Sequence, residues 1–323
     1  MSRLKVVGAG SWGTALAIVL ARRFERVELW GRDSGLVAEM ARGRENPRYL
    51  AGFRLPENVH PTPELAGPAD FILNVVPSQH TREVFMKLAW PVGARLVSAS
   101  KGIEQGSLRR MSEVLTEVTG QPVAVLSGPS FAKEVASGEP AAMVVASSDA
   151  SLAAAVQEAF STPTFRLYTS GDPLGVEVGA SLKNVIAIAA GVVQGLGLGS
   201  NTRAALIARG LAEITRLAVA MGAEARTLSG LAGLGDLVLT CTGDLSRNRR
   251  VGIELAQGKP LSDILKEMGM VAEGVDTTSA ALELAGRYGV EMPIAAQVLR
   301  LLRAEATPAE AIRLLMVRSL KGE

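Results

Sequence analysis

Residues 4–21 read Leu-Lys-Val-Val-Gly-Ala-Gly-Ser-Trp-Gly-Thr-Ala-Leu-Ala-Ile-Val-Leu-Ala, and this stretch decides the fold. An apolar strand over 4–8 runs into a glycine-rich turn, and an Ala/Leu/Ile helix follows. In this context the G-x-G-x-x-G spacing is typical of a dinucleotide site: Gly8 permits the tight turn, Gly10 lets the backbone approach a pyrophosphate, and Gly13 allows close helix packing. The helix N-terminus adds N–H donors and a favourable dipole. The alternative is a glycine-rich turn without a ligand.

The chain then alternates between strand-like and helical runs up to about residue 170. Strands are predicted at 27–30, 71–76, 95–98, 123–126, 143–146 and 165–168, with helices at 80–89, 107–119 and 150–160. This alternation favours a largely parallel, doubly wound sheet of the Rossmann type.

The pattern changes at Asp172-Pro173, which combines a helix N-cap with a first-turn proline. Helices with hardly any strand signal follow, at 173–195, 202–221, 246–257, 261–268, 274–288, 293–304 and 307–316. The last opens with Thr307-Pro308-Ala309-Glu310, a capping box with proline at the first helical position. The sequence therefore predicts an α/β protein with two domains, an NAD(P)-binding Rossmann domain over 1–171 and an all-α substrate and catalytic domain over 172–323.

Composition limits the classes of binding partner and the cellular compartment that we expect. The 323 residues carry 34 basic and 32 acidic side chains, so we expect no basic stripe for nucleic acid and only a small anionic partner. The single cysteine, Cys241, rules out an internal disulfide and suits a reducing compartment. We see no secretory signal, and the longest apolar run, 185–198, is broken by glycines and a glutamine. We expect a cytoplasmic protein without a membrane span or a metal.

Lys183 is the candidate proton donor. Only 8 of the 34 basic residues are lysines, and this one interrupts an apolar helix beside Asn184. Arginine does not give up a proton near neutral pH, whereas a partly buried lysine can. The only histidines, His60 and His80, lie in loop-like contexts. The alternative is a surface lysine whose stem covers apolar neighbours.

Two further segments carry polar groups at helical spacing. Asp236 and Thr240 are four residues apart and so share one helical face, although Asp236 could simply cap a helix. Ser246-Arg247-Asn248-Arg249-Arg250 opens a helix that ends near Gly258. With Ser246 as N-cap, free N–H groups, the helix dipole and a guanidinium converge on one spot, which predicts an anion site. The alternative is a solvated run of charge.

The cofactor preference depends on Trp30-Gly31-Arg32-Asp33, at the end of the second strand. An acid at this position normally binds the adenosine ribose hydroxyls, whereas Arg32 offers a positive charge to a 2′-phosphate. This favours NADP over NAD, with Asp33 as the alternative acid one or two places later.

These segments together resemble the bacterial-type NAD(P)-dependent glycerol-3-phosphate dehydrogenases, through nearly the whole chain. The matching blocks are GAGSWGTALA at 8–17, NPRYL at 46–50, VVPSQ at 75–79, SKGIE at 100–104, SGPSFAKEV at 127–135, SLKNV at 181–185, GLGDLVLTCTG at 233–243 and SRNR at 246–249. The resemblance implies reversible reduction of dihydroxyacetone phosphate to sn-glycerol 3-phosphate, supplying phospholipid synthesis. It leaves the oligomeric state open, with a homodimer as one candidate.

The resemblance also implies a role for each matching residue. The catalytic set is Lys183, Lys101, Asn184, Asp236 and Thr240, with Lys183 transferring the proton. The substrate set is Lys101, Gly128, Ser130, Lys183, Asp236, Ser246, Arg247 and Asn248. The cofactor set is Gly8, Gly10, Ser11, Trp12, Gly13, Arg32, Lys101, Ala132, Arg247, Val271 and Glu273.

Two other functions are compatible with these motifs. A β-hydroxyacid dehydrogenase would share the Rossmann domain, the helical domain and a catalytic lysine, but would act on carboxylate substrates. A dinucleotide-binding regulator would bind the cofactor without turnover.

Overall fold

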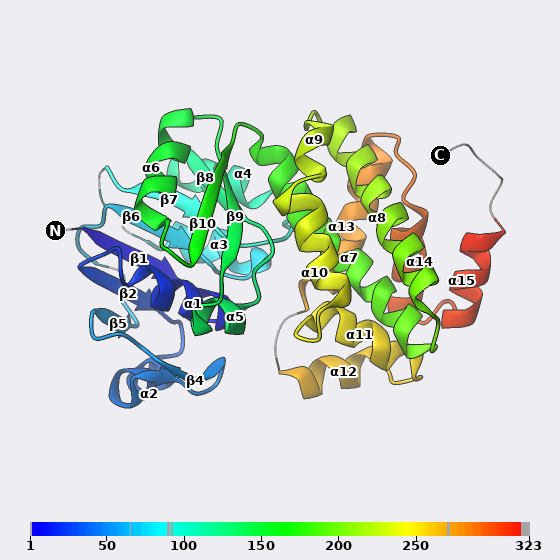
Figure 1. Ribbon diagram of the computed structural model, residues 1–323, viewed down its shortest axis with the longest axis horizontal. Coiled ribbons are helices and arrows are strands. Elements are labelled where there is room, and N and C mark those ends of the chain that lie inside the picture. Colours follow the sequence, from blue (N-terminus) through cyan, green and yellow to red (C-terminus); the bar gives the residue numbers. More distant parts are fainter. Residues whose placement is uncertain (1, 65, 89–90, 92, 270–271, 318–323) are drawn as a thin grey trace. The chain divides into compact units, whose positions relative to one another are not determined.

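The computed structural model describes residues 2–64, 66–88, 91, 93–269 and 272–317, and it folds as two compact units (Figure 1). The first unit comprises Met1–Lys101 and Arg109–Val176, and the second comprises Gly102–Leu108 and Glu177–Glu323.

An eight-stranded sheet forms the first unit. Its strand order is β10-β9-β8-β7-β6-β1-β2-β5. The strands are β1 (Arg3–Val7), β2 (Arg26–Trp30), β5 (Val59–Thr62), β6 (Phe71–Asn74), β7 (Arg95–Ser98), β8 (Val123–Ser127), β9 (Ala141–Ala146) and β10 (Phe165–Ser170). Every neighbouring pair among them is parallel except β8 and β9, which run antiparallel. The predicted, largely parallel sheet is therefore confirmed.

Helices cover both faces of this sheet. Successive strand side chains point to opposite faces, and Val6 and Val7 accordingly enter two separate apolar clusters. The first cluster includes side chains from α1 (Ser11–Leu20) and α6 (Ala150–Phe160). The second includes side chains from α3 (Ser78–Met86) and α4 (Met111–Thr119). This is the doubly wound arrangement expected from the alternation of strands and helices.

The glycine-rich turn joins β1 to α1 as predicted. Gly8 has a φ of +125°, and a Cβ there would lie 2.7 Å from the carbonyl oxygen of Val75. A Cβ on Gly13 would lie 1.8 Å from the carbonyl oxygen of Gly8. Both positions therefore exclude any side chain, which is the packing role that the motif assigns to them.

The second unit is helical in the part that the structure describes. Its helices are α7 (Pro173–Gly195, which starts in the first unit), α8 (Ser200–Ala220), α9 (Ala225–Leu228), α10 (Asp236–Thr242), α11 (Arg247–Ala256), α12 (Leu261–Met268), α13 (Glu273–Arg287), α14 (Pro293–Leu302) and α15 (Pro308–Met316), with one π-helical turn at Leu231–Gly235. The predicted capping box is present, because the Thr307 hydroxyl accepts from the Glu310 N–H at 3.3 Å and the Glu310 carboxylate accepts from the Thr307 N–H at 2.8 Å.

Helix α7 runs through the interior. By length and hydropathy it could cross a membrane, and 94% of its most apolar window is buried within the protein. A core helix passes the same test of length and composition. Among the described residues it is the one helix that does so.

Glycines bring α7 and α11 into close contact. A Cβ on Gly191 of α7 would lie 2.0 Å from the carbonyl oxygen of Arg249, and one on Gly252 of α11 would lie 1.9 Å from that of Ile188. The two backbones therefore touch where they cross. This contact sets the distance between Lys183, which precedes the crossing on α7, and Arg247, which precedes it on α11.

Candidate functional site

Lys183 lies on α7 in a buried polar cluster of the second unit. Its Nζ donates to Asp236 Oδ1 at 2.7 Å and to Thr240 Oγ1 at 2.5 Å. The Thr240 hydroxyl in turn donates to the carbonyl oxygen of Asp236 at 2.7 Å. Asp236 and Thr240 share one face of α10, as their spacing predicts, and the Asp236 carboxylate binds the lysine instead of capping the helix.

Burial decides the character of this cluster. The side chains of Lys183 and Asp236 are 7% and 1% exposed, so Lys183 is not a surface lysine. In so little water, an ammonium and a carboxylate 2.7 Å apart attract each other strongly. The neighbouring Cys241 reports the same environment, because burial raises the pKa of its thiol to about 12 although the charge of Lys183 opposes the shift.

The start of α11 lies beside α7 and α13. Ser246 caps α11 by accepting from the Arg249 N–H at 3.3 Å. The Asn248 side-chain oxygen accepts from the Gly274 N–H at 3.0 Å, at the N-terminus of α13. Gly274 also packs against Asn184, whose carbonyl oxygen lies 2.7 Å from where a Cβ on Gly274 would be. Residues from three helices are thereby brought together around Gly274.

The arginines of α11 divide into two groups. Arg249 is buried and donates to the carbonyl oxygen of Gly243 at 3.1 Å, to Gln194 and to Asp244. Arg250 pairs with Glu254 one turn along the helix. These two charges are thus explained by partners within the protein, and only Arg247, exposed at the first helical position, carries the argument for an anion. The inward role of Arg249 has no signal in the sequence, because all three arginines look alike there.

Lys101, Gly128 and Ser130 meet in the first unit. The Lys101 Nζ lies 3.4 Å from the carbonyl oxygen of Gly128, which also accepts from the Ser130 hydroxyl at 2.9 Å. Gly128 has a φ of +150°, and a Cβ there would lie 2.9 Å from the Cα of Met143. The local backbone therefore requires glycine, and it directs one carbonyl at both polar side chains.

The glycine turn fits a dinucleotide. Nothing lies within 4 Å of where a Cβ on Gly10 would be, so the backbone is open to a ligand at that point. The indole Nε1–H of Trp12 is buried, and within the described part of the chain it has no hydrogen-bond partner. A buried donor without a partner is costly, so a ligand acceptor at this turn is the natural explanation.

The acidic residue that follows β2, Asp33, makes its contacts within the protein. Arg32 is exposed. The Asp33 carboxylate caps α2 (Ser34–Gly43) by accepting from the Leu36 N–H at 3.1 Å, and it lies 3.5 Å from the guanidinium of Arg48. Asp33 is therefore already engaged by a helix N-terminus and a cation.

The remaining predicted residues are spread over both units. Ser11 begins α1, and Ala132 begins α5 (Ala132–Ser137), where it is half-buried. Glu273 begins α13. Val271 lies outside the described residues.

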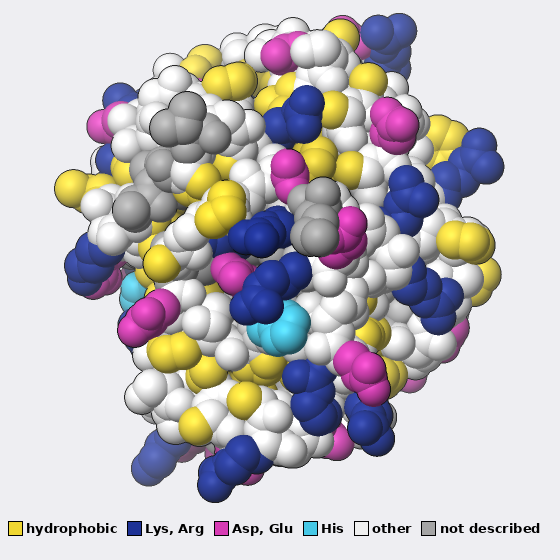
Figure 2. All heavy atoms as spheres, turned by 90° about the vertical axis from the view of Figure 1, so that its left-hand side faces the viewer, with side chains coloured by type: hydrophobic (Ala, Val, Ile, Leu, Met, Phe, Trp, Pro, Cys, Tyr) yellow, Lys and Arg dark blue, Asp and Glu magenta, His cyan; other side chains and the backbone are white. Residues whose placement is uncertain are grey.

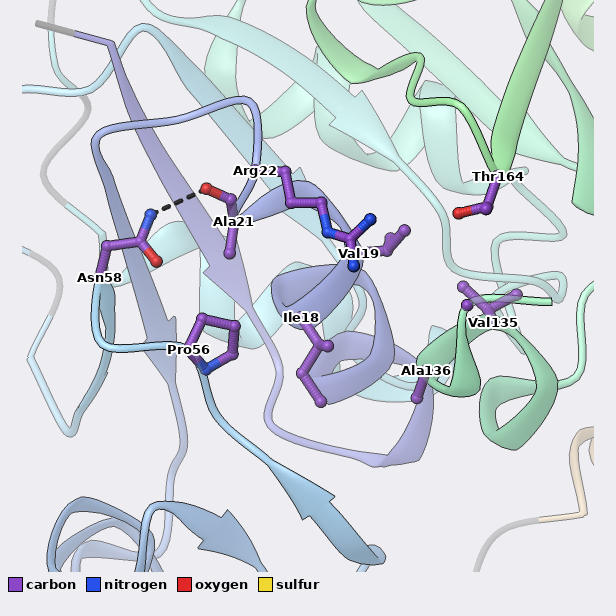
Figure 3. A pocket seen from close by; sticks show the side chains of 10 residues that line it. Ile18, Val19, Ala21, Arg22, Pro56, Asn58, Val135, Ala136 and Thr164 are labelled. Atoms are coloured by element: carbon purple, nitrogen blue, oxygen red, sulfur yellow. Dashed lines mark hydrogen bonds between the residues drawn. The ribbon is translucent and has the colours of Figure 1, made fainter. Parts of the chain in front are cut away.

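A separate hollow of the first unit contains none of the predicted residues. It has a volume of about 270 Å³ and lies beside the C-terminal half of α1, with Ile18, Arg22 and Pro56 among its lining side chains (Figure 3). Among the described residues that line it, the exposed Arg22 is the one with a titratable side chain.

Comparison with known proteins shows which family this chain matches. The sequence model described as the N-terminus of NAD-dependent glycerol-3-phosphate dehydrogenase matches residues 3–153, and that of its C-terminus matches residues 172–313. Glycerol-3-phosphate dehydrogenase [NAD(P)+] from Citrifermentans bemidjiense is 53% identical over 330 residues, covering 99% of this chain and 98% of that protein. The same named enzyme from Geobacter sulfurreducens is 53% identical over 331 residues, covering 99% and 98%.

A solved structure extends the comparison to three dimensions. The glycerol-3-phosphate dehydrogenase of Coxiella burnetii has a TM-score of 0.94 and 41% identity, covering 98% of this chain and 99% of that chain. These matches cover nearly the whole chain, and the chain therefore belongs to the NAD-dependent glycerol-3-phosphate dehydrogenase family.

Proposed function

We propose that this protein reversibly reduces dihydroxyacetone phosphate to sn-glycerol 3-phosphate with NAD(P)H. The observation that carries the proposal is the buried Lys183–Asp236–Thr240 cluster, which holds a proton-bearing group in an apolar helix of a chain from this family. NAD(P)H, when bound, supplies the hydride that adds to the C2 carbonyl carbon. The chain's own residues must then supply a proton, stabilise the developing negative charge and bind the phosphate.

Lys183 is assigned the proton. As the C2 carbonyl is reduced, its oxygen becomes an alkoxide, and a positioned ammonium both stabilises that charge and gives up the proton that completes the alcohol. Asp236 and Thr240 fix the position of the nitrogen in the resting enzyme. The family resemblance implies that Asn184 supports Lys183, and that Lys101 adds positive charge at the same oxygen and contacts the nicotinamide. In the oxidative direction neutral Lys183 takes the proton back.

The phosphate is assigned to the start of α11. Ser246, Arg247 and Asn248 combine a helix N-terminus with a guanidinium and a side-chain amide. Because the Asn248 oxygen is engaged by Gly274, its NH₂ group is the end that can donate to an anion. Binding energy at this remote group would align the carbonyl for reaction. Gly128 and Ser130 complete the substrate contacts.

The cofactor is assigned to the glycine turn of the first unit. Backbone N–H groups around Gly10 and Ser11 bind the pyrophosphate, with Trp12 alongside. Ala132, Arg247 and Glu273 provide further contacts, as the family resemblance implies, and Val271 is a predicted contact outside the described residues.

The preferred cofactor is NADPH, because Arg32 is exposed after β2 and Asp33 is engaged by α2 and Arg48. Arg32→Ala should lower kcat/KM for NADPH while leaving that for NADH nearly unchanged. Arg26→Ala, which removes an exposed arginine at the other end of β2, is the matched control and should leave the ratio as in the wild type. An unchanged NADPH/NADH ratio in Arg32→Ala would show that Arg32 does not contact the 2′-phosphate.

We further propose a cytoplasmic enzyme of phospholipid backbone supply, without a nucleic-acid partner or a membrane span. Basic and acidic side chains are interspersed over the face shown in Figure 2, which is unlike a phosphate-backbone footprint. A homodimer is the assembly to test by light scattering.

An absorbance assay at 340 nm tests the activity. Purified protein with dihydroxyacetone phosphate should oxidise NADPH or NADH, and with β-keto acid substrates it should not. Turnover with the acids alone would identify a β-hydroxyacid dehydrogenase instead. Cofactor binding without turnover on any substrate would identify a dinucleotide-binding regulator.

A further inference from the structure

Asn46 connects a segment without an assigned role to the glycine turn. It begins the NPRYL segment and forms β3 (Glu45–Asn46), which pairs with β4 (Leu50–Arg54). Its side chain has no exposed surface, so it cannot act at the protein surface. A fully buried amide is retained only where its hydrogen bonds are made inside the protein.

Among the described residues, the hydrogen-bond partners of this amide lie in the first unit. The Asn46 Nδ2 donates to the carbonyl oxygen of Ala9 at 2.9 Å and to the Thr14 hydroxyl oxygen at 2.8 Å. The Asn46 Oδ1 accepts from the Tyr49 N–H at 3.1 Å. Ala9 is the residue between Gly8 and Gly10, and Thr14 lies in the first turn of α1. One side chain thus joins the turn to the helix that follows it.

The contact with Ala9 determines the direction of a neighbouring donor. The carbonyl of Ala9 and the N–H of Gly10 belong to one planar trans peptide, so they point in opposite directions. Holding the carbonyl toward Asn46 therefore holds the Gly10 N–H away from it. Gly10 is the point at which the turn is open to a ligand.

We propose that Asn46 is a positioning residue for the dinucleotide. It acts through Ala9 and Thr14, without touching the cofactor, by fixing the peptide between Ala9 and Gly10 in the orientation that a pyrophosphate requires. This inference rests on the proposed use of NAD(P)H. Without Asn46 the turn keeps its glycines but loses the bond that selects one orientation.

The chain offers a matched control in Asn58. Its Nδ2 donates to the carbonyl oxygen of Ala21 at 2.8 Å, at the opposite end of α1 (Figure 3). It also donates to the carbonyl oxygen of Phe24 at 2.8 Å. Asn46→Ala and Asn58→Ala each remove an amide that makes two donor contacts around the same helix. Only the first touches the glycine turn.

The experiment measures the Kd for NADPH by titration calorimetry, together with Tm and steady-state kinetics, for wild type and both variants. We expect Asn46→Ala to raise the Kd for NADPH about tenfold, corresponding to about 1.4 kcal/mol, with kcat at saturating NADPH within about twofold of wild type. Asn58→Ala should lower Tm with an unchanged Kd. Asn46→Asp keeps the side-chain volume but loses the donor to Ala9, so it should also raise the Kd for NADPH. This variant tests the inference if Asn46→Ala does not fold.

Two outcomes would overturn the inference. One is a wild-type Kd in a folded Asn46 variant, and the other is an equal rise in Kd for the Asn46 and Asn58 variants, which would reflect general destabilisation. If the wild type itself binds neither NADPH nor NADH, the proposed function fails instead.

Discussion

At the scale of single residues, the buried pair of Lys183 and Asp236 shows how a charge is kept inside an apolar helix. Taking two ions out of water is unfavourable, and their attraction offsets this only when the geometry is good and further hydrogen bonds are made. Thr240 makes one of those bonds. Removing one partner leaves the other buried and unpaired, which costs about 3–5 kcal/mol.

Lys183→Met should lower kcat by roughly 10²-fold or more, the scale for loss of a general acid, with the Kd for NADPH little changed. Stability should also fall, because Asp236 loses its cation. Lys5→Met is the control, since Lys5 is a buried lysine of the first unit that donates to the carbonyl oxygens of Ala66 and Gly67. It should lose stability but keep its kcat. A Lys183→Met enzyme with most of its turnover would refute the assignment.

Arg247→Ala should lower kcat/KM for dihydroxyacetone phosphate about 10- to 150-fold, because a charge-assisted hydrogen bond contributes roughly 1.5–3 kcal/mol. Unphosphorylated dihydroxyacetone should react poorly with both proteins and hardly respond to the mutation. Arg250→Ala, on the same helix but paired with Glu254, should behave like the wild type. Equal losses on both substrates in Arg247→Ala would mean that this arginine acts on the cofactor or on the fold.

At the scale of elements, the crossing of α7 and α11 links the proposed proton donor to the proposed phosphate site. Gly252→Ala would place a methyl group 1.9 Å from the carbonyl oxygen of Ile188, so the helices must move apart. We expect a loss of about 1–3 kcal/mol in stability from overpacking. The KM for dihydroxyacetone phosphate should rise by a larger factor than the Kd for NADPH, whose main site is the glycine turn.

Gly286→Ala tests whether helix propensity alone explains that result. Gly286 lies in α13 with nothing within 4 Å of an added Cβ, so alanine there should stabilise the helix by roughly 0.5–1 kcal/mol. If Gly252→Ala were equally harmless, the two helices would not be held by glycine contact.

The long elements were predictable because each carries its own pattern. The sequence predicts helices at 173–195 and 261–268 with the bounds that α7 and α12 have. It does not predict α2, α5, α9 or the strands β3, β4 and β5. Apart from α2 these elements have only two to six residues, too few for a period to appear, and tertiary packing decides them.

The candidate site was likewise predictable from the sequence only in part. Motif spacing places Asp236 and Thr240 on one face, and the cap at Ser246 follows from residue type. The ion pair of Lys183 with Asp236 joins residues 53 apart in sequence, so only the family resemblance could imply it. Nothing local distinguishes the inward Arg249 from the outward Arg247, because their difference arises from where α11 packs.

At the scale of the whole molecule, the predicted domains 1–171 and 172–323 remain a prediction, and the two compact units divide the chain in a similar but not identical way. The short segment Gly102–Leu108 belongs with the helical unit, where the Gly102 N–H donates to the Ser181 hydroxyl at 3.0 Å. A prediction with one domain boundary cannot assign a short segment of the N-terminal half to the C-terminal unit.

Cofactor binding should stabilise the glycine turn and its flanking elements most. NADPH at about 100 times its Kd should raise the free energy of unfolding by about 2.7 kcal/mol, and removing it by dialysis should reverse the effect. Hydrogen exchange should slow most in β1 and α1 and least in α14 and α15, which hold no predicted cofactor residue. Equal protection of α15 and α1 would contradict a site at the glycine turn.

Cys241 gives the protein a built-in reporter. It is the only cysteine, it is fully buried, and its thiol pKa of about 12 leaves almost no thiolate at neutral pH. A thiol-reactive dye can therefore label the native protein only during moments when α10 opens. Thr240 precedes Cys241 on that helix. The labelling rate of the unmodified wild type therefore measures how often α10 opens and the hydrogen bonds of Lys183 with Asp236 and Thr240 break.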